Sequence, residues 1–81
     1  MYKLLIVSPD REKIRGCKVN FMKPIEVGNT MMFSGLRKGS NKNFVHRSAV
    51  VERFIEQDNS INVVTKDGTL YIFREVSNEE N

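Results

Sequence analysis

The sequence predicts a small, mainly β, single-domain protein in which about five strands form a barrel. Short apolar or alternating runs recur between turn-forming residues, which is typical of strands. An Asp-Gly pair separates two β-rich runs and marks a hairpin. At 81 residues the chain is long enough for one domain only. Closing the sheet into a barrel would remove its exposed edges. We expect the barrel to cover residues 1–76 and an acidic, disordered tail to cover residues 77–81.

Three strands are expected in the first half of the chain. The apolar run at 2–8 ends at Ser8-Pro9-Asp10 because proline cannot continue a paired strand. An alternating run at 17–22 ends before Pro24, and a short run at 30–33 lies between two glycine-containing turns. The charged residues 10–16 between the first two runs predict a turn or a single helical turn.

Near the C-terminus, Asp67-Gly68 predicts a two-residue hairpin turn between the runs 61–66 and 69–74. Such a turn would pair Val63 with Ile72. The remaining apolar side chains would then share the outer face of the hairpin, where another strand, a loop or a partner must cover them; they are Val64, Tyr71 and Phe73.

Residues 48–57 fit two structures. Ser48 could cap a short helix, since the apolar residues that follow it recur at helical spacing. The same residues could form a long bent strand that enters the hairpin through Asp58-Asn59-Ser60. The β-branched and aromatic content favours the strand.

The charge of the chain is divided between its two ends. Residues 1–50 carry ten Lys or Arg against three acidic residues, whereas residues 51–81 carry three basic against seven acidic residues. The net charge of +7 on the first part and −4 on the second steers encounters with anionic or acidic partners.

Catalytic and metal-binding signatures are missing from the sequence. The chain has one histidine, His46, and one cysteine, Cys17, which are too few ligands for a zinc site. The segment Gly35 to Ser40 is not a phosphate-binding P-loop, since the spacing of its glycines and the residue after them differ. We therefore expect no enzyme activity, no metal and no cofactor.

The expected location is the cytoplasm. A single cysteine cannot form an internal disulfide, which suits a reducing compartment. The longest apolar run, Leu4 to Val7, is far too short to cross a membrane or to act as a signal peptide.

Three segments carry a resemblance to a known class: Glu26-Val27-Gly28-Asn29, Arg47-Ser48-Ala49-Val50-Val51, and the run 65–73. In this order they resemble small Src-homology-3-like β-barrel proteins of phage type, in which a glycine-containing turn precedes a strand. A basic-Ser/Thr strand then leads into a terminal hairpin. The resemblance implies an SH3-like barrel that binds proteins or nucleic acids and acts as a regulator or inhibitor. The chain has no tryptophan and so lacks the groove with which such domains bind proline-rich peptides.

The main candidate site is the basic loop at 36–47. Its glycines allow tight turns, and its cations would neutralise phosphates or carboxylates. A second basic set, Arg11, Lys13, Arg15 and Lys18, is interrupted by acidic residues, so we expect local ion pairs there. Most aromatic residues must fill the core, but three could be exposed and bind. The candidate binding residues are Arg37, Lys38, Lys42, Phe44, His46, Arg47, Tyr71 and Phe73.

These features predict a non-catalytic regulatory or inhibitory module of phage type that docks on the acidic surface of a larger host protein. Tyr71 and Phe73 would supply its apolar anchor. One alternative is a nucleic-acid-binding barrel that contacts phosphates through the basic loop, with Phe44 as a stacking group. Another is a small anionic ligand, such as a nucleotide, bound at the barrel mouth. A homodimer through the Val64, Tyr71 and Phe73 face is a further expectation.

Overall fold

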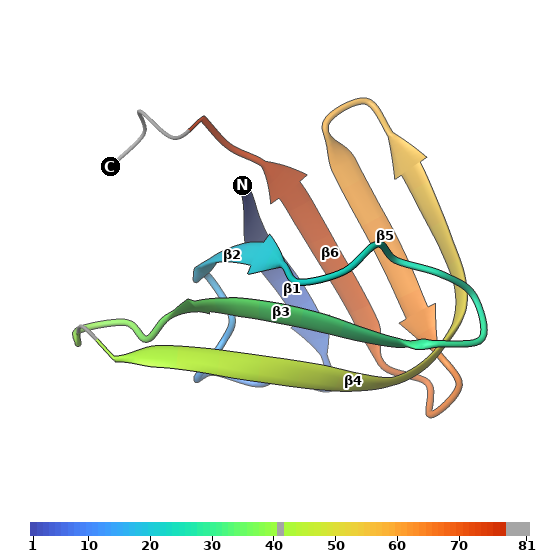
Figure 1. Cartoon of the computed structure of the whole chain (residues 1–81), viewed down its shortest axis with the longest axis horizontal. Helices are drawn as coiled ribbons and strands as arrows, with labels where there is room; N and C mark the ends of the chain where they lie inside the picture. The colour runs from blue at the N-terminus through green and yellow to red at the C-terminus, as the bar shows by residue number, and fades with distance from the viewer. Residues whose placement is uncertain (41, 78–81) are drawn as a thin grey trace.

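The computed structural model describes residues 1–40 and 42–77, and every regular element within them is a β-strand. Each strand pairs antiparallel with the next one along the chain, and β6 pairs with β1, so the sheet closes into a barrel (Figure 1). The prediction of a mainly β, small single domain is confirmed. The six strands are β1 (Tyr2–Ser8), β2 (Lys18–Phe21), β3 (Thr30–Leu36), β4 (Asn43–Gln57), β5 (Ser60–Thr65) and β6 (Leu70–Glu75).

A bulge in β1 lets an unbroken apolar run serve both faces of the barrel wall. Leu4 pairs with Phe73 and Ile6 with Ile72, so one extra residue, Leu5, lies between the two pairs. Leu4 and Val7 are buried, whereas Leu5 and Ile6 are exposed. Simple alternation would have turned Leu4 and Ile6 to the same side.

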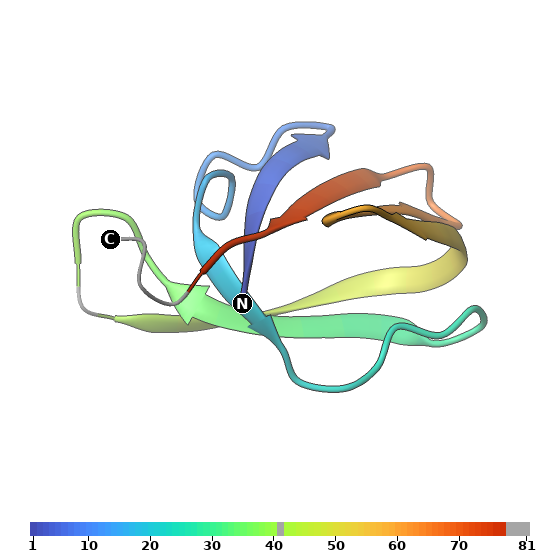
Figure 2. The same cartoon turned by 90° about the horizontal axis from the view of Figure 1, so that it is seen from above.

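The longest strand, β4, joins the two sides of the barrel. Its first half pairs with β3 and its second half with β5 (Figure 2), and the pairing shifts between Val51 and Arg53, where the strand bends. A second irregularity lies in the pairing with β3, where Arg47 to Val50 oppose Met32 to Thr30. There the Ser48 hydroxyl accepts a 2.9 Å hydrogen bond from the Met31 amide. The strand prediction for 48–57 is confirmed, and the alternative of a Ser48-capped helix is wrong.

The hairpin between β5 and β6 differs from the prediction by one residue. Its loop has three residues, Lys66-Asp67-Gly68, closed by a 2.9 Å hydrogen bond from the Gly68 amide to the Thr65 carbonyl. Within this loop only Gly68 has a positive φ, +87°. A type I turn followed by a glycine of positive φ produces this geometry, whereas a two-residue turn would need both residues at positive φ.

This shift of one residue exchanges the two faces of β6. Val63 pairs with Tyr71, and Val64 pairs with Leu70. Tyr71 and Phe73 are therefore buried in the core with 1% and 0% of their surfaces exposed, and the outward-facing residues are Leu70 and Ile72. The predicted outer face of Val64, Tyr71 and Phe73 is wrong, and the homodimer expected through it has no such surface to use.

The described part of the chain contains no helix that is long and apolar enough to cross a membrane. Ser77, the first residue of the predicted acidic tail, is exposed; residues 78–81, which make up the rest of that prediction, lie outside the described residues.

Candidate anion-binding site

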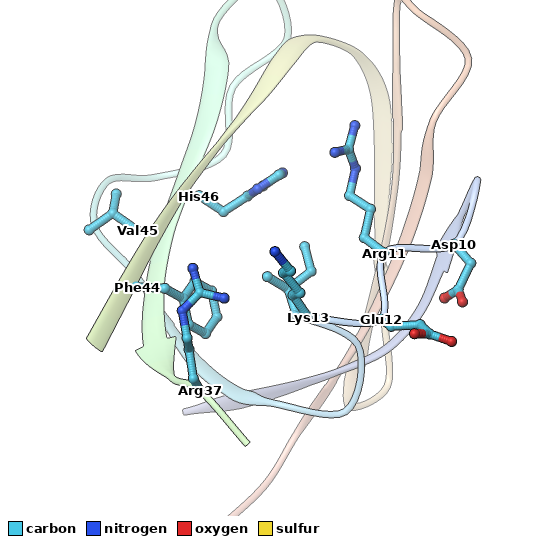
Figure 3. A pocket seen from close by; sticks show the side chains of 9 residues that line it. Asp10, Arg11, Glu12, Lys13, Arg37, Phe44, Val45 and His46 are labelled. Atoms are coloured by element: carbon cyan, nitrogen blue, oxygen red, sulfur yellow. The ribbon is translucent and has the colours of Figure 1, made fainter. Parts of the chain in front are cut away.

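Two basic segments that are far apart in the sequence meet at one end of the barrel. The turn at 10–14 and the residues around the β3–β4 loop border a pocket of about 650 Å³. Figure 3 shows the side chains of Arg11, Lys13, Arg37 and His46 around this cavity. We call this pocket the basic mouth, defined by these four residues.

Backbone hydrogen bonds to β1 hold the 10–16 turn in place. The amides of Ile14 and Arg15 both donate to the Arg11 carbonyl, so the segment forms a single helix-like turn, the second of the two predicted forms. The Gly16 amide then donates to the Leu4 carbonyl, and Gly16 has a φ of +83° that favours glycine. Ile14 is buried in the core cluster and so anchors the turn to the barrel.

The acidic residues of this turn do not cancel its positive charge at the mouth. Asp10 forms a 2.8 Å ion pair with Arg15, as local pairing predicted. In Figure 3 the carboxylates of Asp10 and Glu12 point away from the cavity, and the side chains of Arg11 and Lys13 point towards it. The mouth therefore presents cationic groups, although its lining contains both signs of charge.

Arg37 is placed over an aromatic platform. Its guanidinium carbon lies 5.9 Å from the centroid of the Phe44 ring, within the range of a cation–π interaction. The ring packs edge-on against Phe33 and fills the space beside Gly35. A Cβ on Gly35 would lie 2.5 Å from the Lys18 carbonyl oxygen, so only glycine permits this close packing.

The burial of Phe44 changes its predicted role. Only 7% of the side chain is exposed, so the ring cannot serve as a free stacking group for a nucleobase. This part of the nucleic-acid hypothesis is wrong. Phe44 instead positions the Arg37 guanidinium through their cation–π interaction.

His46 lies at the inner side of the mouth. Its Nε2 and the hydroxyl of Tyr71 form a 3.0 Å hydrogen bond. Burial lowers the pKa of His46 below its usual 6.5, and the nearby charge of Arg11 lowers it further. The imidazole is therefore neutral near pH 7, and an anion bound in the mouth would offset the effect of Arg11 on its charged form.

The other predicted cations are distributed unevenly. Lys38 joins Lys13 and Arg37 around a smaller adjoining depression of about 280 Å³. Lys42 and Arg47 do not line the mouth. Arg47 lies on the outer face of β4, where its guanidinium contacts the Met32 sulfur at 3.8 Å. The backbone of Lys42 closes the loop by accepting a hydrogen bond from the Arg37 amide.

Tyr71 and Phe73 do not belong to an exposed binding surface. Both are core residues, and their rings stack at 6.1 Å with an angle of 4° between their planes. The expectation that most aromatic residues fill the core is confirmed for them, but their predicted use as an apolar anchor is wrong. Tyr71 still contributes indirectly, because its hydroxyl orients His46.

Sequence reasoning undervalued Arg11 and Lys13. It treated them as part of a mixed-charge turn, because nothing in the spacing of residues 10–16 reveals which way each side chain points. The helical turn itself contains a usable signal. Successive residues of a helix point about 100° apart around its axis, so neighbouring acidic and basic side chains can face different sides.

The geometry of the mouth suits the binding of an anion. Two guanidinium groups can each donate paired hydrogen bonds to a phosphate or carboxylate, and an ammonium group adds a point charge. Within residues 1–40 and 42–77, no cluster of three His, Cys, Asp or Glu side chains is arranged to hold a metal ion.

Comparison with protein-family models, curated proteins and solved structures found no match. The resemblance to SH3-like proteins of phage type therefore stays a prediction.

Proposed function

We propose that this chain is a non-catalytic binding protein that takes up the phosphate group of a small anionic ligand, such as a nucleotide, in the basic mouth. The observation that carries the proposal is the convergence of Arg11, Lys13 and Arg37 on one pocket from two separate segments. A pocket of about 650 Å³ is in the range that small-molecule sites occupy.

Phosphate is the preferred anion because of the number and geometry of the donors. A phosphate group has several oxygens and can accept from two guanidinium forks at once, while a single carboxylate has two oxygens. Neutral His46 can donate or accept a hydrogen bond at the inner side of the pocket, depending on its tautomer.

Docking on the acidic surface of a larger host protein is the second candidate. The exposed side chains of Val45 and Leu36, next to the basic residues, favour it. They would supply apolar contacts for such a regulator beside its basic residues, whereas Tyr71 and Phe73 are buried.

Isothermal titration with inorganic phosphate, a nucleoside monophosphate and a glutamate-rich peptide tests the proposal. We expect the nucleotide to bind and the peptide to bind at least tenfold more weakly. Lys13→Gln and Arg11→Gln should each weaken nucleotide binding by about tenfold, in line with the loss of one charge-assisted hydrogen bond.

Lys23→Gln is the matched control, because Lys23 is an exposed lysine that does not line the mouth. It should leave binding unchanged. Nucleotide binding that is unaffected by both mouth variants, or no binding of phosphate compounds at all, would overturn the proposal. Stronger binding of the acidic peptide would favour the docking candidate.

A further inference from the structure

The basic mouth is the first of three depressions that have lining residues in common. The smaller depression beside it shares Glu12, Lys13 and Arg37 with the mouth and is also lined by Lys38. Lys38 in turn lines a second pocket of about 530 Å³ next to β2 and β3. We call the path from the mouth through Lys13, Arg37 and Lys38 to this second pocket the basic groove.

The second pocket has a different chemistry from the mouth. Asn20, Ser34 and Asn43 line it with amide and hydroxyl groups, and Leu36 adds apolar surface. Lys18 and Lys38 also line it, so it is basic as well. Its described lining contains no acidic side chain. Amide groups offer donors and acceptors side by side, the arrangement that matches the edge of a nucleobase, while Leu36 can contact a base face.

The groove therefore combines two features. Cations line the mouth, the connecting depression and the second pocket, and Glu12 borders the first two. Only the second pocket adds neutral amide groups and the apolar side chain of Leu36. A linear ligand that has negatively charged groups along its backbone and flat, polar side groups could contact both the cations and the amide groups. The carboxylates of an acidic peptide would also meet these cations, but they can only accept hydrogen bonds, whereas a nucleobase edge both donates and accepts, as the amides of Asn20 and Asn43 do.

We propose that the basic groove binds a single-stranded oligonucleotide, with one phosphate in the mouth, the next near Lys38 and an unpaired base in the second pocket. The inference rests on the proposed function and extends it from one phosphate to a strand. A duplex would not fit in this way, because its base edges are already paired. No exposed aromatic ring among the described residues lines the groove, so stacking contributes little.

Fluorescence polarisation with a labelled single-stranded tetranucleotide, in competition with a mononucleotide, tests the extension. We expect the tetranucleotide to bind at least tenfold more tightly than the mononucleotide. Lys38→Gln should remove most of this gain and leave mononucleotide binding unchanged, while Lys13→Gln should weaken both ligands. Lys23→Gln again serves as the control for a lost surface charge.

Salt dependence gives a second measurement. Each phosphate contact to a single strand contributes a slope of about −0.7 to the plot of log K against log salt concentration, so Lys38→Gln should make the slope shallower by roughly that amount. Asn43→Ala should weaken the tetranucleotide but leave this slope unchanged, because an amide releases no counterion.

The two proposals fail in distinguishable ways. Equal affinity for mononucleotide and tetranucleotide, or an unaltered preference in Lys38→Gln, would overturn the groove while leaving the phosphate site intact. Equal or tighter binding of a duplex or of an oligoglutamate of the same charge would also overturn it. Loss of all phosphate binding would instead overturn the proposed function itself.

Discussion

At the scale of single residues, the pKa of His46 is the property that responds most directly to an anion in the basic mouth. His46 is the only histidine in the chain, it is half-buried, and its partners are defined: Tyr71 through a hydrogen bond, and Arg11 through charge. Lys13 and Arg37 also border the pocket that it faces. Burial and the charge of Arg11 disfavour a protonated imidazole, and a bound anion would offset the charge of Arg11.

The first prediction concerns the titration of His46 by NMR. In the free protein its pKa should lie below 6.5, and saturating sulfate should raise it, because the anion offsets the charge of Arg11. The single histidine makes the assignment unambiguous. A pKa that does not change on addition of sulfate would show that no anion binds beside the imidazole.

The same shift links His46 to stability. Its pKa in the folded state is lowered, so the unfolded chain binds more protons in the window below about 6.5, the unfolded value. Stability should therefore fall as the pH decreases from 6.5 towards the folded pKa. His46→Gln should weaken this dependence, which urea unfolding at pH 7.5 and pH 5.5 measures.

At the scale of elements, turns and bulges decide which residues reach the site. The three-residue loop after β5 sets the register of β6, so that the Tyr71 side chain faces the core and contacts His46. The bulge in β1 changes which side chains face the core in the residues just before the 10–16 turn. Asp67 reinforces that loop, since one of its carboxylate oxygens accepts hydrogen bonds from the Thr65 hydroxyl and the Thr69 amide.

Substitution of Gly68 tests this loop geometry. Its φ of +87° strains any residue that has a Cβ, although no atom would clash with one there. Gly68→Ala should lower the free energy of unfolding by about 1–2 kcal/mol, the cost of a left-handed backbone for an L-residue. Gly68→Asn should cost less, since asparagine tolerates this region better. Equal stability of all three proteins in urea unfolding would contradict the assigned turn.

At the scale of the whole molecule, closure between β1 and β6 defines the barrel. The sequence predicted the barrel class, the strand at 2–8 and the strand nature of 48–57, because propensity and periodicity are local. It did not predict the register of β6, since Asp-Gly occurs in both two-residue and three-residue hairpin loops. Nor did it predict that Arg11 and Lys13 meet Arg37, because the pairing of β2 with β3, which local patterns do not specify, brings these segments together.

Leu4 lies on the closing seam, paired with Phe73 and fully buried. Leu4→Ala should lower the free energy of unfolding by about 2–5 kcal/mol, a large share of what a domain of this size has. Ile6→Ala, two residues along and 46% exposed, should cost less than about 1 kcal/mol. If thermal unfolding gave similar losses for both, the bulge between them would be wrongly assigned.

Closure through β1 and β6 also sets an order of events during protein synthesis. Translation produces β1 well before β6, so the apolar segment Leu4 to Val7 must wait at an open edge while the intervening strands emerge from the ribosome. Its pairing with β6 spans most of the described chain, and contacts of such long range are slow to form. The nascent barrel therefore stays vulnerable to aggregation until β6 has left the exit tunnel, and chaperone protection of β1 would matter most in that interval.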